Sequence, residues 1–114
     1  MNTPRKIMKP WGFEILYAHS SQYAGKVIFI KKGHRLSLQY HEKKDETIYV
    51  YSGKVLLETE GTITMCSGDM KRILPNTKHR IVALDNTTIL EVSTPELDDI
   101  VRIEDDYGRV RHNV

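Results

Sequence analysis

Short stretches in which apolar and polar residues alternate make up most of this chain. A period of two places successive side chains on opposite faces, which is typical of a β-strand with one buried face. Gly, Pro, Asn and Asp separate these stretches at near-regular spacing, and nothing before Pro95 repeats with a helical period. The pattern predicts strands over residues 13–18, 26–32, 35–41, 46–51, 55–60, 62–66, 70–74, 79–84 and 89–94. We therefore expect an all-β fold, an antiparallel barrel or sandwich.

The most informative alternation lies in residues 33–53, which read GHRLSLQYHEKKDETIYVYSG. Apolar residues at 36, 38 and 40 alternate with polar ones, so Gln39 and His41 are expected to point the same way. Four turn-forming residues follow, and the alternation resumes at Glu46. We predict a hairpin that brings Glu46 beside His41.

A fourth candidate donor, His79, begins the predicted strand 79–84 and shares a face with Ile81 and Ala83, where it can line a barrel interior. Taken alone, such a residue is more often a solvated or hydrogen-bonded group, so the joint spacing carries the prediction. The candidate metal ligands are Gln39, His41, Glu46 and His79. This mixed oxygen and nitrogen set suits a divalent Zn, Mn, Fe, Co or Ni ion with open positions for water or substrate.

With 114 residues, the chain is expected to form a single domain, residues 1–114, with a single core. Residues 1–8 form a polar arm. Residues 95–114 form a tail, which we expect to be a turn of helix followed by an extended segment.

The charges are balanced and scattered: 17 Lys and Arg face 15 Asp and Glu, with no basic block, so nucleic acid is an unexpected partner. The one cysteine, Cys66, excludes an internal disulfide and is expected to be a small buried hydrophobic residue. No apolar run approaches 18 residues, and no apolar segment follows the basic start. A soluble, cytoplasmic protein that does not contact a membrane is expected.

The spacing G-x5-Q-x-H-x4-E-x6-G in residues 33–53, with a second block from Gly68 to His79, resembles the two motifs of the cupin superfamily. Within it the chain resembles most the cupin module of the type II mannose-6-phosphate isomerases. Further matching segments are residues 9–12, the pairs 79–80 and 91–92, and the tail at 98–102 and 105–109.

This resemblance implies a double-stranded β-helix, or jelly roll, built from two packed sheets. It also implies that Gln39, His41, Glu46 and His79 bind the metal, that the substrate is a small molecule such as a sugar phosphate, and that the chain forms a homodimer. The arm at residues 1–8 is a candidate strand for exchange across that dimer.

Two residues are candidate catalytic groups, Lys44 and Arg35. The family usually has arginine where this chain has Lys44, and His-Trp where it has Thr47-Ile48. Lys44 is a candidate base, although a surface-loop lysine is the alternative; Glu46 can be the base if it is not a tight ligand. Arg35 should point inward with Gln39, to bind a substrate anion or to pair with an internal acid.

Arg80, Arg102 and Arg109 are the other arginines relevant to anion binding. Arg80 has opposite parity to His79 and is expected to face outward. Arg102 and Arg109 can close over a phosphate, or can lie in solvent or at an interface.

Three functions follow from this site. The first is a metal-dependent aldose–ketose isomerase like mannose-6-phosphate isomerase. The second is a cupin that binds a sugar or small acid without turning it over. The third is a small metal-dependent oxygenase, which the glutamine ligand makes the least favoured.

Overall fold

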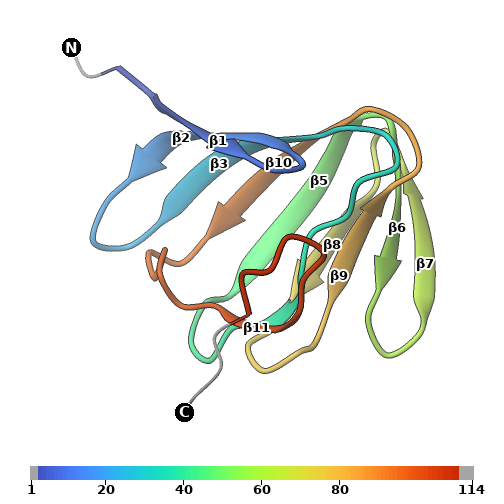
Figure 1. Cartoon of the computed structure of the whole chain (residues 1–114). Helices are drawn as coiled ribbons and strands as arrows, with labels where there is room; N and C mark the ends of the chain where they lie inside the picture. The colour runs from blue at the N-terminus through green and yellow to red at the C-terminus, as the bar shows by residue number, and fades with distance from the viewer. Residues whose placement is uncertain (1–2, 111–114) are drawn as a thin grey trace.

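The computed structural model describes residues 3–110, and within them eleven strands and no helix form two packed layers (Figure 1). The strands are β1 (Arg5–Lys9), β2 (Gly12–His19), β3 (Ala24–Ile30), β4 (Leu38–Tyr40), β5 (Glu46–Ser52), β6 (Lys54–Glu58), β7 (Thr62–Cys66), β8 (Met70–Ile73), β9 (Arg80–Ala83), β10 (Thr87–Ser93) and β11 (Val101–Glu104). The all-β prediction is confirmed. No helix among these residues is able to span a membrane.

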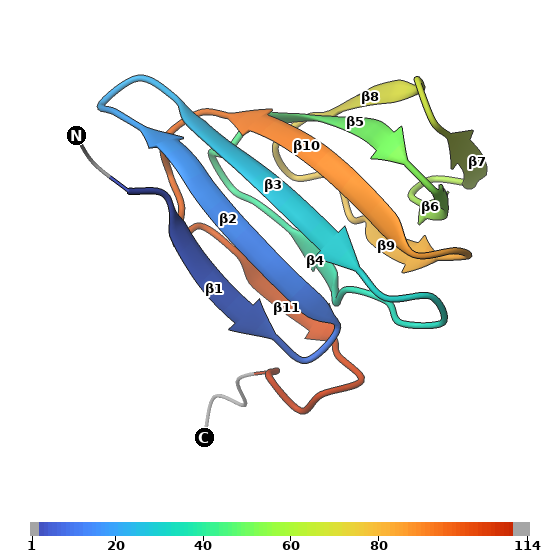
Figure 2. The same cartoon turned by 90° about the horizontal axis from the view of Figure 1, so that it is seen from above.

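The first layer is a six-stranded antiparallel sheet in the order β1-β2-β3-β10-β5-β8. The second layer contains the sheet β7-β6-β9 and the pair β11-β4. Single bridges from Arg35 to Val82 and from Gln39 to His79 join these two parts. The second layer therefore runs β11-β4-β9-β6-β7 beneath the first, as Figure 2 shows from above.

The core lies between the layers and comes from the inward positions of alternating strands. In β5, for example, Glu46, Ile48 and Val50 are buried while Tyr49 and Tyr51 are exposed. Each fully buried aliphatic side chain contributes about 1.5–3 kcal/mol. The core residues are Trp11, Ile28, Ile30, Ile48, Val50, Val55, Leu57, Met65, Ile73, Ile81, Ala83 and Ile89.

The predicted hairpin between residues 35–41 and 46–51 is wrong, although its consequence for the site holds. β4 has only three residues and pairs with β11, whereas β5 lies between β10 and β8 in the other layer. The segment 42–45 crosses from one layer to the other. Glu46 and His41 meet because they face each other across the interior, since alternation sets the face of a side chain but not its partner strand.

The structures of the arm and of the tail differ from those predicted from the sequence. Arg5–Lys9 pairs in register with β2 of the same chain, so residues 5–8 of the predicted arm belong to an edge strand; Met1 and Asn2 lie outside the described residues. In the tail the expected helical turn is only a hydrogen-bonded turn at Leu97-Asp98, and the extended part is β11. Residues 111–114 lie outside the described residues.

Cys66 is exposed, so its predicted burial is wrong. Its neighbour Met65 occupies the inward position of β7 at 2% exposure. The pattern of residues 62–66 predicted the strand correctly, but it assigned Cys66 to the buried face when Met65 is the buried residue.

Candidate metal centre

Three buried side chains converge between the layers: His41 just after β4, Glu46 at the start of β5 and His79 just before β9. The Nε2 atoms of both histidines lie 3.2 Å from Glu46 Oε1. One donor atom from each residue lies within 4.8 Å of the other two. The structure therefore brings together three of the four metal ligands predicted from the sequence.

The hydrogen bond made by Nδ1 of each histidine determines which ring nitrogen is available to bind a metal. His41 Nδ1 lies 2.6 Å from the Asp99 carbonyl oxygen, and His79 Nδ1 lies 2.8 Å from the Thr77 carbonyl oxygen. A carbonyl oxygen only accepts, so each Nδ1 carries a proton and donates it. In the neutral ring, Nε2 then presents a lone pair toward Glu46. Two imidazole nitrogens and a carboxylate oxygen, with outer hydrogen bonds that orient the rings, fit a divalent first-row metal.

Gln39, the fourth predicted ligand, is half-buried in β4 and lines the same cavity as His41. Its Oε1 accepts a hydrogen bond from the Ser37 hydroxyl at 2.7 Å. Its backbone forms a reciprocal pair of hydrogen bonds with His79, which ties β4 to β9 at the metal donors. Metal binding by Gln39 stays a prediction.

Asp99 positions the crossing segment that carries the site. Its carboxylate accepts hydrogen bonds from the backbone N–H groups of Glu42, Lys43 and Lys44 at 3.0, 2.7 and 2.9 Å. Although partial burial raises the pKa of Asp99, these three donors hold it below its usual value. Because its carbonyl also orients His41, Asp99 connects the tail to the metal donors.

Lys44 is not the surface-loop lysine that we considered as the alternative: it is 5% exposed. Its Nζ lies 3.3 Å from Glu46 Oε2 and 3.6 Å from Glu91 Oε2. Burial alone lowers the pKa of Lys44, but the negative charges of Glu91 and Glu46 raise it above its usual value. Lys44 therefore remains a cation beside the metal donors.

Glu91 is a site residue that the sequence pattern did not indicate. It is a buried carboxyl at an inward position of β10, and burial together with the charge of Glu46 raises its pKa to about 8. For Glu46, burial raises the pKa, but the close contacts of its carboxylate with His41 and His79 lower it well below the usual value. A charged residue at an inward strand position was the signal that could have identified Glu91.

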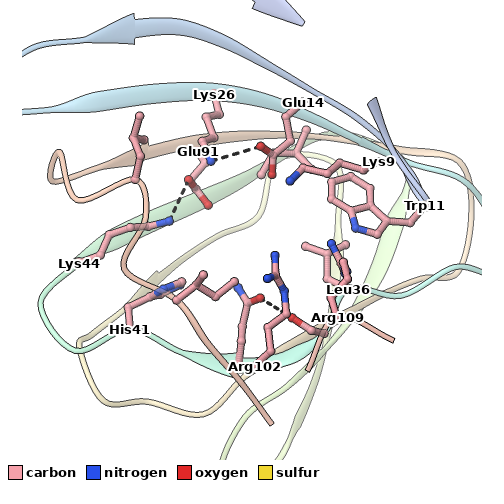
Figure 3. Close-up of a pocket in the computed structure, with 15 residues that line it drawn as sticks. Lys9, Trp11, Glu14, Lys26, Leu36, His41, Lys44, Glu91, Arg102 and Arg109 are labelled. Atoms are coloured by element: carbon pink, nitrogen blue, oxygen red, sulfur yellow. Dashed lines mark hydrogen bonds and ion pairs between the residues drawn. The ribbon is translucent and has the colours of Figure 1, made fainter. Parts of the chain in front are cut away.

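A cavity opens beside these donors, and most of its charged lining is basic (Figure 3). Five of the lining side chains are Lys or Arg and two are Glu. These residues are Lys9, Lys26, Lys44, Arg102, Arg109, Glu14 and Glu91. Arg102 and Arg109, which were left open between phosphate binding and a solvated or interface role, both line the cavity.

Two further arginines behave differently from the expectations. Arg35 is 41% exposed and forms a two-pronged ion pair with the exposed Asp106, at 2.6 and 2.8 Å. It does not line the cavity and its acid partner is exposed, so the predicted inward position of Arg35 is wrong and the geometry gives its catalytic role no support. Arg80 is 3% exposed, so its predicted outward position in solvent is wrong. It donates to the Leu36 carbonyl oxygen, just before β4, and to the Glu104 carbonyl oxygen in β11, so partners from neighbouring segments of the same layer bury it.

Comparison with known proteins gives one family match, to the model described as Mannose-6-phosphate isomerase C-terminal, over residues 1–105. A curated relative, the mannose-1-phosphate guanylyltransferase ManC of Salmonella typhimurium, is 30% identical over 112 residues. That alignment covers 93% of this chain but only 23% of the relative. The chain thus spans about a quarter of the length of such relatives.

Two solved structures share the fold. KdgF from Halomonas sp. superposes with a TM-score of 0.76 at 22% identity, covering 85% of this chain and 91% of that one. An RmlC-like cupin from Shewanella frigidimarina gives a TM-score of 0.73 at 15% identity, covering 81% and 84%. Identities this low show a common cupin fold and nothing finer.

Proposed function

Because this chain belongs to the mannose-6-phosphate isomerase C-terminal family, we propose that it is a metal-dependent aldose–ketose isomerase acting on a phosphorylated sugar. One observation carries the proposal. The buried donors His41, Glu46 and His79 form one cluster, and His41 together with Gln39 lines a cavity whose charged lining is mainly basic. A metal-binding end and a cationic lining in one small cavity suit a substrate that carries both a sugar carbonyl and a phosphate.

His41, Glu46 and His79 would bind the divalent metal, with Gln39 as the fourth ligand. When bound, such an ion supplies a Lewis acid that stabilises negative charge on the sugar oxygens. The contacts of Glu46 with both histidines support its assignment as a metal ligand, so we propose that another residue is the base.

The isomerisation moves one proton from C2 to C1 and another from the C2 hydroxyl to the C1 oxygen. Glu91 is the carboxyl group that lines the cavity next to the metal donors, so we assign the carbon-bound proton to its ionised form, which predominates above its pKa of about 8. Lys44 lies between Glu46 and Glu91 and can transfer the proton between the two oxygens. Figure 3 shows both side chains on the His41 side of the cavity.

The direct test is interconversion of mannose 6-phosphate and fructose 6-phosphate by protein loaded separately with Zn, Mn, Fe, Co or Ni. We expect turnover that chelation abolishes. Lys44→Met should lower kcat by about 10²–10⁴, the usual contribution of general acid–base catalysis, without loss of metal. Lys43→Met, one position away and exposed, is the matched control and should stay near wild type. No turnover with any of the five metals would contradict the proposal.

A second candidate is a cupin that binds the sugar phosphate without isomerising it. Two departures from the family pattern favour this alternative. Lys44 stands where the family usually has arginine, and Thr47-Ile48 stands where it usually has His-Trp. Lysine does not reproduce the two-pronged hydrogen bonding of arginine. Calorimetric binding of metal and sugar phosphate, without turnover and unchanged in Lys44→Met, would identify this alternative.

We also propose that the chain is a homodimer that associates through the outer face of the six-stranded sheet. An apolar row crosses this face from β8 to β2 through paired positions: Met70, Tyr49, Leu90, Val27 and Ile15. Met70 and Tyr49 are 60% and 40% exposed. A continuous apolar row on a sheet face is a common site of self-association.

Sedimentation or size-exclusion measurements should give twice the 13.2 kDa chain mass. Tyr49→Glu should shift the protein to monomer, because it places a charge in the centre of the apolar row. Ile63→Glu is the matched control, since Ile63 is similarly exposed, at 39%, but lies on β7 in the other layer. A wild-type monomer, or equal effects of both variants, would contradict the proposed dimer.

A further inference from the structure

The cavity has two chemically different sides (Figure 3). His41, Lys44 and Glu91 lie on one side, whereas Lys9, Trp11 and Arg109 lie on the other. The second side is assembled from distant parts of the chain: the β1–β2 corner contributes Lys9 and Trp11, and the tail contributes Arg102 and Arg109.

Trp11 supplies a hydrogen-bond donor that has no acceptor among the described residues. Its indole is 2% exposed and lines the cavity, and its Nε1 is buried without a hydrogen-bond partner. The corner is held in place, because the backbone N–H of Lys31 donates to the Trp11 carbonyl oxygen at 2.9 Å. A buried donor without an acceptor is destabilising, so this N–H indicates a site for an oxygen-bearing ligand.

The cations on this side are close enough to repel one another. Burial lowers the pKa of Lys9, and the charges of Lys26, Arg102 and Arg109 lower it further, against the opposing effect of Glu14. Glu14 itself pairs with Lys26 at 3.3 Å. A group of cations that disfavour each other's charge is stabilised by a bound anion.

Arg109 is already oriented for such a ligand. Its guanidinium donates to both oxygens of Asp105 at 2.8 and 2.9 Å, and the Asp105 side chain is fully buried. The Arg109 guanidinium also lies 5.6 Å from the centre of the Tyr107 ring, and Tyr107 is hydrogen-bonded to His34. These contacts fix a long, flexible side chain at the cavity before any ligand arrives.

We propose that Lys9, Trp11, Arg102 and Arg109 form a binding subsite for a phosphate group. Two arginines, a lysine and an indole N–H offer more donors than a carboxylate can accept, and they suit the oxygens of a phosphate. The subsite holds the phosphate of the substrate and so directs its carbonyl end toward His41, Glu46 and His79. Only this last statement rests on the proposed isomerase function.

Trp11 makes the test direct, because it is the only tryptophan of the chain. Metal-free full-length protein is titrated with inorganic phosphate while tryptophan fluorescence is recorded, so that metal–phosphate contact is excluded. We expect a saturable change, and we expect mannose 6-phosphate to bind at least about tenfold more tightly than mannose. Lys9→Met and Arg102→Met should each weaken phosphate binding about tenfold, and Trp11→Phe, followed by calorimetry, should weaken it as well.

Lys54→Met is the control, because Lys54 is an exposed lysine on β6 that does not line the cavity. Circular dichroism of each variant verifies the fold, and Lys9→Met keeps the test valid if Arg102→Met fails to fold. No saturable change, equal affinity for mannose and mannose 6-phosphate, or wild-type binding by Lys9→Met would overturn the subsite. Phosphate binding without isomerisation would instead retain the subsite and reject the isomerase.

Discussion

Glu46→Gln is expected to abolish metal binding while the fold is retained. Glu46 Oε1 is the atom that both His41 Nε2 and His79 Nε2 face at 3.2 Å, so its charge is central to the donor set. The glutamine amide keeps the shape and can still hydrogen-bond to the imidazoles, but it removes the anionic ligand. The metal affinity should fall by more than the roughly 100-fold that follows loss of an outer hydrogen-bond partner of a ligand.

Elemental analysis and calorimetric metal titration measure this loss, and any isomerase activity should fall with it. Asp45→Asn is a close control, because Asp45 is the preceding residue but its carboxylate pairs with Arg72 on the surface. It should bind metal like the wild type. Stoichiometric metal at wild-type affinity in Glu46→Gln would show that the three side chains are a buried hydrogen-bond network and not a metal centre.

Gly12→Ala is expected to be the most destabilising single methyl addition in the described chain. Gly12 begins β2 with a φ of 155°, and an added Cβ would overlap the backbone carbonyl group of Phe29 in β3. A glycine-only backbone region costs about 1–3 kcal/mol and overpacking costs about 1–3 kcal/mol, so the free energy of unfolding should fall by about 2–6 kcal/mol. The strand partner is backbone and cannot rotate away.

Denaturant unfolding of wild type and variant measures this difference. Gly61→Ala is the matched control, because its Cβ would have no heavy atom within 4 Å. That change should leave stability nearly unaltered. Since Gly12 follows Trp11, Gly12→Ala should also weaken phosphate binding at the subsite, whereas Gly61→Ala should not. Equal stability of the two variants would show that β2 and β3 can separate without cost.

The candidate metal donors could be identified from the sequence alone. Each lies within or at the end of an alternating segment, at a position that the alternation places on the buried face. Ser37, His41, Glu46 and His79 are buried as the parity of their segments required. Their partner strands could not be identified, because alternation is a local property whereas strand pairing joins residues far apart. The predicted hairpin therefore placed Glu46 beside His41 with the wrong topology.

The surroundings of Arg80 and Lys44 did not follow from the sequence. The parity of Arg80 predicted an outward position, and a surface loop was the alternative for Lys44, yet both are buried with partners from other segments. Arg80 meets the Glu104 carbonyl oxygen in β11, and Lys44 meets Glu91 in β10. The cost of burying a charge depends on these partners, which only the folded chain provides.

The amino-acid sequence by itself determined where most strands lie, which faces they present and which side chains can bind a metal, because these follow from backbone geometry over a few residues. The tertiary structure decided what surrounds those donors. Glu91 reaches the metal donors from β10 and Lys44 from the crossing segment 42–45, and the basic side of the cavity joins β1 to the tail. Charges interact through space and not along the chain, so their grouping appears only after the two layers have packed.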